Sequence, residues 1–206
     1  GLADEASKVG AHVVGGDIVR GEKITISVTA LGQLGDRQPI LRSGAQVNDV
    51  VAVAGRLGYS AAGLQMLRRG FRSPRNLVNA HRMPTPDYEL AITGRIASSM
   101  IDVSDGLVAD LGHIARASHV AIHIDSAALV VDDDVASAAS AFAMDPLPWL
   151  LHGGEDHAFV ATFPDALAVP THWVIIGRVV AGPPAVLVDG RDLPSGGWDH
   201  FAAPNR

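Results

Sequence analysis

The segment MIDVSDGLVADLGHI, residues 100–114, changes its hydrophobic period halfway along. Its apolar start predicts a short buried strand over residues 100–103, and the spacing that follows predicts an amphipathic helix over residues 105–117. The apolar positions of that helix are three or four residues apart: Leu107, Leu111 and Ile114. The polar positions expected on its solvent face are Asp110, His113 and Arg116. The segment therefore predicts a strand that leads directly into a helix.

Three polar side chains lie where the predicted strand gives way to the helix: Asp102, Ser104 and Asp105. The first turn of a helix has N–H groups without partners and a partial positive charge, and both favour phosphate oxygens. Two carboxylates beside a phosphate can also hold Mg²⁺ against it. The competing interpretation is an ordinary N-cap at Ser104 or Asp105, with Asp102 as a turn residue. The segment alone leaves both interpretations open.

Two glycine-rich motifs place acidic residues in tight connections: VGGDIVRG, residues 14–21, and HGGEDH, residues 152–157. Asp17 follows an apolar run, and the two glycines before it let the backbone turn sharply or approach a ligand closely. A plain turn is the competing interpretation there. HGGEDH resembles a site for a cation or a hydroxyl group. A zinc site at His152 and His157 is disfavoured, because the spacing is not HExxH and no third soft ligand is nearby.

Two further motifs contain a side chain suited to ligand binding. Arg42 in LRSGA, residues 41–45, could hold a phosphate through its forked donors. Trp198 in GWDHF, residues 197–201, could stack on an aromatic ring of a ligand. The competing interpretations are a solvated surface arginine and a tryptophan packed on the core.

Strands and helices interleave along the rest of the chain, which predicts an α/β or α+β architecture. Strands are expected over residues 23–31, 49–54, 121–124, 158–163, 173–180 and 185–188, and helices over residues 2–8, 60–69 and 135–144. The polar stretch from Leu31 to Ser43 is a candidate domain boundary, and residues 72–86, with three prolines, are expected to be loop-rich.

The composition excludes several classes of protein. Sixteen basic residues against 22 acidic ones give a net charge of −6, which argues against nucleic acid as a partner and suits a cation site. The absence of cysteine excludes disulfides and thiolate catalysis and agrees with the cytoplasm as the expected location. Because no apolar run approaches the ~18 residues of a membrane span, a membrane association is not expected. Acidic clusters without a Walker A motif or a GxGxxG motif indicate Mg²⁺-dependent phosphoryl transfer outside the common nucleotide-binding folds.

Taken in order, the motifs resemble those of the thiamine-monophosphate kinase family, in the aminoimidazole-ribonucleotide-synthetase-like superfamily. They are GGDIVRG, LRSGA, GYSAAGL (residues 58–64), MIDVSDGLVADLGHI, HGGEDH and GWDHF, and they extend from about Gly15 to Phe201. GGD and SDG also occur in sister enzymes, whereas the combination with GGED and the terminal GWDHF is typical of the thiamine branch. The departures are Ile18, where Thr is frequent, and His157, where Tyr is common.

The resemblance implies an α+β fold of two domains, a homodimer, and ATP-dependent phosphorylation of thiamine monophosphate to thiamine diphosphate with Mg²⁺ as the cofactor. It implies ATP contacts, metal ligands and substrate contacts at particular positions. The ATP contacts are Gly16, Asp17, Arg42 and Ser104, the metal ligands are Asp17, Asp102 and Asp105, and the substrate contacts are Glu155 and Trp198. It assigns no general base.

By the same resemblance, residues 1–38 correspond to the tail of the N-terminal ATP- and Mg²⁺-binding domain, and residues 39–206 to the C-terminal domain. The start at Gly1 then corresponds to a missing front section, and residues 1–206 alone are expected to lack kinase activity. Two alternatives to the kinase are a sister ATP-dependent synthetase of the same superfamily and an inactive truncated chain.

Overall fold

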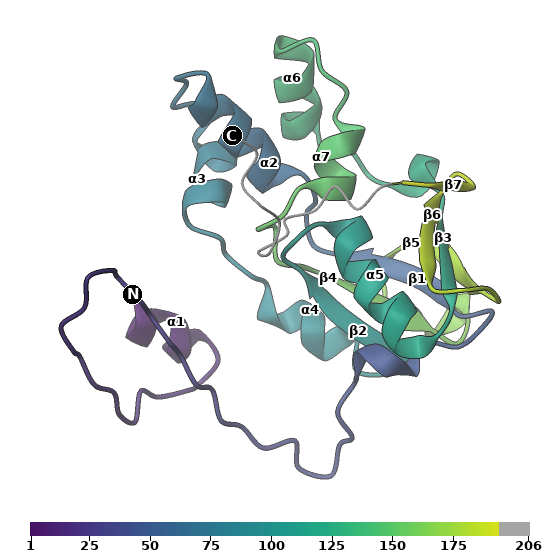
Figure 1. The fold of residues 1–206 in the computed structure, drawn as a ribbon, viewed down its shortest axis with the longest axis horizontal. Coiled ribbons are helices and arrows are strands. Elements are labelled where there is room, and N and C mark those ends of the chain that lie inside the picture. The colour runs from purple at the N-terminus through teal and green to yellow at the C-terminus, as the bar shows by residue number, and fades with distance from the viewer. Residues whose placement is uncertain (194–206) are drawn as a thin grey trace. The chain divides into compact units, whose positions relative to one another are not determined.

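A computed structural model describes residues 1–193 and divides the chain into two compact units, Gly1–Pro39 and a second unit from Ile40 onward (Figure 1). The first unit holds helix α1 (Leu2–Lys8), as the sequence predicts. Residues 9–39 form no regular helix or strand, so the strand predicted over residues 23–31 is wrong. Its apolar side chains are exposed, Ile24 to 96% and Ile26 to 82%. A strand needs a hydrogen-bonded neighbour, and none of the described residues pairs with this segment.

The second unit is built on a seven-stranded sheet of order β2-β4-β1-β5-β3-β6-β7. All its pairings are antiparallel except β3 with β6. The strands are β1 (Val50–Ala54), β2 (Ser99–Val103), β3 (Ala121–Ile124), β4 (Ala158–Phe163), β5 (Val174–Val180), β6 (Ala185–Val188) and β7 (Arg191–Asp192). Each of the six strands β1 to β6 agrees with a predicted one to within about a residue. The turn Asp189-Gly190, with positive φ at both residues, joins β6 to β7.

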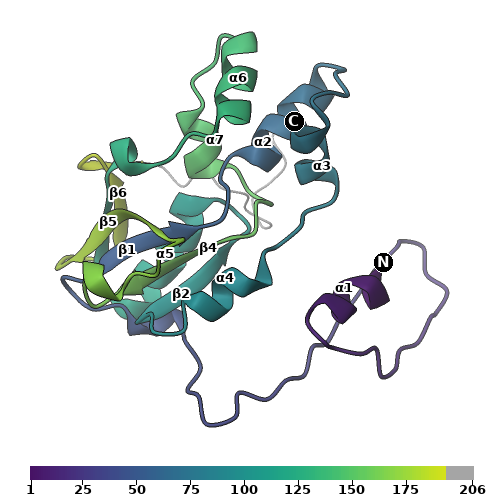
Figure 2. The same ribbon diagram turned by 180° about the vertical axis from the view of Figure 1, so that it is seen from behind.

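Helices cover both faces of this sheet (Figure 2). They are α2 (Tyr59–Arg68), α3 (Arg75–Arg82), α4 (Tyr88–Thr93), α5 (Leu107–Ser118), α6 (Asp133–Ala141) and α7 (Leu147–His152), with the short 3₁₀ turns η1 (Arg42–Gly44), η2 (Ser126–Ala128) and η3 (Ala166–Ala168). The mixture confirms the α+β class. Helix α3 corrects the prediction of a loop over residues 72–86. That helix forms because Leu77 and Val78 are buried against α2, a tertiary contact that its mostly polar sequence conceals.

Strand β1 shows why its sequence is continuously apolar. Val51 and Val53 face the larger core, which includes α2, α5 and α7, whereas Ala52 and Ala54 face a smaller core on the opposite side. The smaller core is centred on Phe163 and Trp173, whose rings meet edge to face at 5.3 Å. A strand buried on both faces has no polar side and so loses its alternation.

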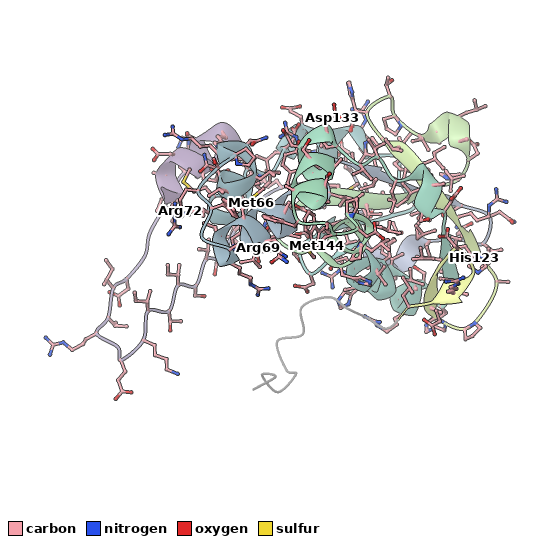
Figure 3. All side chains as sticks on the ribbon, turned by 90° about the horizontal axis from the view of Figure 1, so that it is seen from above. Met66, Arg69, Arg72, His123, Asp133 and Met144 are labelled. Carbon is pink, nitrogen blue, oxygen red and sulfur yellow. The ribbon has the colours of Figure 1, made fainter. Side chains whose placement is uncertain are left out.

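The helices α2 and α6 are connected through a stacked arginine. The Arg69 guanidinium lies 4.2 Å from the centre of the Phe142 ring and donates to the sulfur of Met144 at 3.8 Å (Figure 3). These contacts fasten the α6–α7 connection to the end of α2. Among residues 1–193, no helix is long and apolar enough to span a bilayer.

Candidate active site

Two motifs that are far apart in the sequence are locked together by their backbones. The Glu155 N–H donates to the Ser104 carbonyl at 2.8 Å, and the His157 N–H donates to the Val103 carbonyl at 3.0 Å. A Cβ atom at Gly154 would lie 2.5 Å from that same Ser104 oxygen. Gly154, the second glycine of HGGEDH, is therefore required for the two loops to approach each other.

Gly106 closes the same junction from the other motif. It adopts φ 123°, a conformation that side chains disfavour, and a Cβ atom there would lie 2.9 Å from the backbone of His152. The SDG and HGGEDH motifs thus form one interlocked structure at the end of β2.

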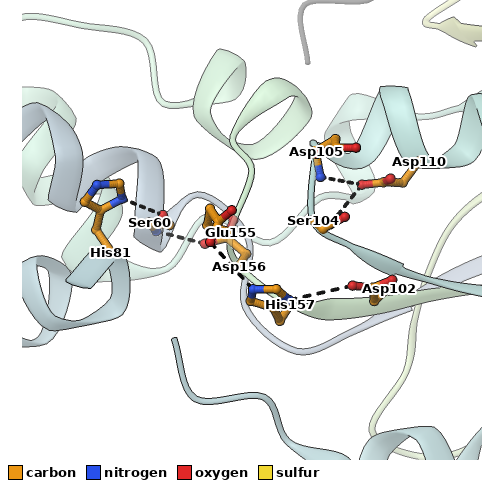
Figure 4. Close-up of polar contacts among 9 residues, drawn as sticks. All are labelled: Ser60, His81, Asp102, Ser104, Asp105, Asp110, Glu155, Asp156 and His157. Carbon is orange, nitrogen blue, oxygen red and sulfur yellow. Dashed lines mark hydrogen bonds and ion pairs between the residues drawn. The ribbon is translucent and has the colours of Figure 1, made fainter. Parts of the chain in front are cut away.

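Asp110 is buried, 2% exposed, and this corrects its predicted place on the solvent face of α5. Its Oδ2 accepts the backbone N–H groups of Ser104, Asp105 and Gly106 at 3.0, 3.0 and 3.1 Å (Figure 4). Burial raises the pKa of Asp110 despite these donors. These three N–H groups precede Leu107, the first residue of α5, so Asp110 orders the loop before the helix and does not occupy the N–H groups of its first turn.

The competing N-cap interpretation of this motif is also wrong. Helix α5 has Gly106 at its N-cap and no side-chain capping bond. Neither Ser104 nor Asp105 caps the helix; the carboxylate of Asp110, in the first turn of α5, instead fixes the loop that leads into it. The sequence around Asp110 does not show whether its side chain faces the protein interior or the solvent.

At the mouth of the interlocked loops, one imidazole lies between two carboxylates. His157 Nδ1 is 3.6 Å from an Asp102 oxygen, and His157 Nε2 is 3.8 Å from a Glu155 oxygen (Figure 4). The two acids are partly exposed, 45% and 61%, and the histidine is less so, 28%. The structure therefore brings together the predicted metal ligand Asp102 and the predicted substrate contact Glu155. Sequence analysis considered a role for His157 only as a disfavoured zinc ligand, and its position two residues after Glu155 in HGGEDH was the available signal for a contact with that acid.

Arg42 shares an open pocket of about 530 Å³ with Asp102. The other lining residues are Ile40, Leu41, Ser43, Met100, Ile101 and Ala117. The Ser118 hydroxyl donates to the Arg42 carbonyl at 2.9 Å and accepts the Ala45 N–H at 3.2 Å, which ties η1 to the end of α5. A Cβ atom at Gly44 would lie 1.8 Å from the Ser98 carbonyl oxygen, so this glycine too is required by close packing.

The described residues contain one group of three side chains close enough to hold a metal: Asp105, Asp110 and His113. Their ligand atoms lie within 4.8 Å of one another. Asp102 is not part of that group, but its carboxylate faces solvent from the same end of the sheet. Carboxylate oxygens are the donors that Mg²⁺ prefers, so Asp102 and Asp105 fit that ion chemically.

The remaining predicted site residues lie elsewhere. Gly16 and Asp17 belong to the first unit, where the Asp17 carboxylate accepts the Ile18 N–H at 2.8 Å. Trp198 lies outside the described residues. The ligand roles of all these positions stay predictions.

Comparison with known proteins gives strong similarity to one family. The chain is 47% identical to the thiamine-monophosphate kinase of Mycobacterium tuberculosis over 209 residues, covering 100% of this chain and 62% of the relative. It is 32% identical to the thiamine-monophosphate kinase of Halobacterium salinarum, covering 97% of this chain and 69% of the relative. The chain thus spans less than two thirds of the length of the Mycobacterium relative.

A solved structure, AaThiL complexed with AMPPCP and TMP, matches with a TM-score of 0.74 and 34% identity, covering 79% of this chain and 54% of that one. No protein-family model matches the chain. The sequence motifs, the shared fold and the extent of the identity lead to one conclusion: the chain belongs to the thiamine-monophosphate kinase family.

Proposed function

We propose that this protein transfers the γ-phosphoryl group of ATP to the phosphate of thiamine monophosphate, giving thiamine diphosphate and ADP. The observation that carries the proposal is the joining of SDG to HGGEDH, which places Asp102 within ion-pair distance of His157 and brings Glu155 to the same imidazole. The similarity to thiamine-monophosphate kinases, and to AaThiL bound to AMPPCP, an ATP analogue, supports the assignment.

The acceptor in this reaction needs little help to become a nucleophile. The second pKa of a phosphate monoester is close to 6, so at neutral pH its oxygens are already largely ionised. One of them attacks the γ-phosphorus, a new P–O–P bond forms, and the bond to the β–γ bridging oxygen breaks as ADP leaves. The absence of an assigned general base is consistent with this chemistry.

The main obstacle is the meeting of two anions, and positive charge is needed to overcome it. We propose that Asp17, Asp102 and Asp105 hold Mg²⁺, which neutralises the polyphosphate when it is bound. Arg42 contributes a fixed cation with a forked donor pair in the same pocket as Asp102. Gly16 and Ser104 complete the ATP contacts in this proposal.

The substrate side of the site is proposed to lie at Glu155 and Trp198. Thiamine carries a positively charged ring, which a partly exposed carboxylate such as that of Glu155 attracts. An aromatic side chain such as Trp198 stacks on rings of this kind. We also propose residues 1–38 as the tail of an ATP-binding N-terminal domain, a homodimer as the assembly, and the cytoplasm as the location.

The test is a direct assay in the complete enzyme, at the length of its curated relatives. The protein is incubated with ATP, Mg²⁺ and thiamine monophosphate, and the products are separated by chromatography. Thiamine diphosphate should form in amounts equal to ADP, and chelation of Mg²⁺ with EDTA should stop the reaction. Product from unphosphorylated thiamine but not from thiamine monophosphate would contradict the proposal, as would ATP cleavage without any thiamine product.

A further inference from the structure

The carboxylate of Asp156 fastens the HGGEDH loop to the first turn of α2. Its Oδ2 accepts the Gly58 N–H at 2.6 Å, and its Oδ1 accepts the Ser60 N–H at 2.8 Å. The Ser60 hydroxyl in turn lies 3.0 Å from Nδ1 of His81 on α3, so this turn is itself fixed (Figure 4). None of the ligand roles derived above uses Asp156.

The residues on either side of Asp156 adopt an unfavourable backbone conformation. Glu155 has φ 64° and His157 has φ 51°, both in the left-handed region that residues other than glycine seldom occupy. Such conformations persist where the surrounding structure enforces them, and they concentrate at functional sites. Here the result is a loop in which the Asp156 side chain reaches α2, the His157 side chain reaches Asp102 on β2, and the Glu155 side chain reaches His157 (Figure 4).

The loop is therefore held from two sides. On the β2 side its backbone N–H groups bond to the carbonyls of Val103 and Ser104. On the α2 side the attachment is the side chain of Asp156. The N–H groups of Glu155 and His157 are the β2-side attachment, and Asp156 lies between these two residues in the chain. Loss of the Asp156 attachment therefore leaves the loop held from the β2 side alone.

We infer that Asp156 is a positioning residue for the substrate side of this site: its carboxylate holds residues 152–157 in the left-handed geometry that places His157 beside Asp102 and Glu155 at the other ring nitrogen of the same imidazole. The inference rests on the proposed function, and Asp156 itself touches no reacting atom. On this turn each N–H group is bonded to a separate oxygen of the carboxylate. An asparagine would offer one oxygen, and its NH₂ group would face the second N–H.

The ionised carboxylate of Asp156 is kept in place against the effect of burial. Burial raises the pKa of Asp156 to about 6, because desolvation outweighs the hydrogen bonds that favour the ionised form. At neutral pH the ionised group therefore costs folding free energy relative to its protonated form. Strongly shifted pKa values concentrate at functional sites, where a loss of stability is accepted in return for the arrangement that the function needs.

The test compares Asp156→Asn with the matched control Asp165→Asn. Asp165 also accepts two backbone N–H groups, those of Leu167 and Ala168 at 2.8 and 2.9 Å, but it lies at the start of η3. Amide hydrogen exchange is measured residue by residue in the protein carrying each variant. In Asp156→Asn the amides of residues 58–60 and 152–157 should exchange about tenfold faster, since a buried donor loses its acceptor. Unchanged exchange at these amides would overturn the inference.

Steady-state kinetics in the complete enzyme then separate positioning from general damage. Asp156→Asn should raise KM for thiamine monophosphate about tenfold and leave KM for ATP within about twofold, with Asp165→Asn unchanged in both. Equal changes in both KM values, or faster exchange without any change in KM for thiamine monophosphate, would also overturn it. A wild-type enzyme that does not phosphorylate thiamine monophosphate would refute the proposed function instead, and the exchange measurement would still decide whether Asp156 holds the loop.

Discussion

Residues 50–54 and residues 23–31 have the composition of strands, yet only the first segment becomes one. Val51 and Val53 are 0% and 6% exposed, and β1 is hydrogen-bonded to β4 on one side and β5 on the other. Ile24 and Ile26 are 96% and 82% exposed, without a pairing strand among the described residues. An apolar alternation therefore shows that a segment suits a sheet, whereas partners elsewhere in the chain decide whether the sheet forms.

The glycine motifs of the two units differ in the same way. Gly154 lies against the Ser104 carbonyl, and Gly106 lies against His152, so each is fixed by a neighbour from another motif. At Gly15 and Gly16, no atom of residues 1–193 other than those of the adjoining residues lies within 4 Å of the place where a Cβ would be. A glycine motif acquires a structural meaning when a second segment packs onto it.

The largest expected effect is on catalysis. Asp102→Asn should lower the turnover of the complete enzyme at least about 100-fold, because a lost metal or transition-state contact costs several kcal/mol. Its melting temperature should change little, since the Asp102 side chain is 45% exposed. Turnover and thermal unfolding are measured together, with Asp192→Asn on the exposed strand β7 as the control. Near-normal turnover at saturating Mg²⁺ would remove Asp102 from the site.

A pair of glycine substitutions tests the contrast between the two motifs directly. Gly154→Ala should lower the free energy of unfolding by about 3 kcal/mol, because the new methyl group would lie 2.5 Å from the Ser104 carbonyl oxygen and force the two loops apart. Gly16→Ala should change it by less than about 0.5 kcal/mol. Both values come from urea denaturation. Similar values for the two variants would show that the loops at residues 103–106 and 152–157 are not interlocked.

Acidification tests the buried carboxylate of Asp156. Its pKa is raised from 3.8 to about 6, so between these values the native state keeps a proton that the unfolded chain has lost. The contribution of this group to the free energy of unfolding should therefore be largest below pH 4, fall as the pH rises toward 6, and stay constant above that. The difference is about 2–3 kcal/mol. The free energy of unfolding of wild type and of Asp156→Asn is measured by denaturation across this pH range, and the difference between them gives the contribution of Asp156. A difference that does not change with pH would contradict the raised pKa.

The smallest expected effects concern the two strand-like segments. Val51→Thr should destabilise the protein by about 1–2 kcal/mol, because it buries a hydroxyl group in the larger core. Ile26→Thr should leave the free energy of unfolding within about 0.5 kcal/mol of wild type, because its side chain is exposed. Denaturant titrations of the two variants give the comparison. A marked loss in Ile26→Thr would mean that residues 23–31 are packed in solution.

The sequence predicts those parts of the fold that depend on local pattern. Strands such as 121–124 and 158–163 have the expected bounds, because their mostly apolar runs are short and are followed by residues that interrupt a strand, Asp125 and Pro164. The helix at Arg75–Arg82 was not predictable in this way, since two buried residues against α2 stabilise it. Distant pairing, as of β1 with β4, leaves no trace in either strand's own residues.

The candidate site was predictable to a similar extent. Asp102 and Glu155 were singled out by their motifs, and the structure brings these two motifs together, which the sequence did not predict. The inward direction of Asp110 and the attachment of Asp156 to α2 depend on backbone N–H groups of other segments. No periodicity within a single segment records such contacts.

The most direct test of the central claim is to measure phosphoryl transfer by the Asp102→Asn variant. Formation of thiamine diphosphate from ATP and thiamine monophosphate is followed in the complete enzyme, with and without the substitution, at several Mg²⁺ concentrations. We predict that the wild type forms thiamine diphosphate and that the rate of the variant is at least about 100-fold lower. Added Mg²⁺ should not restore that rate. Equal rates in the two proteins would contradict the claim that the end of β2 and the HGGEDH loop form the active site.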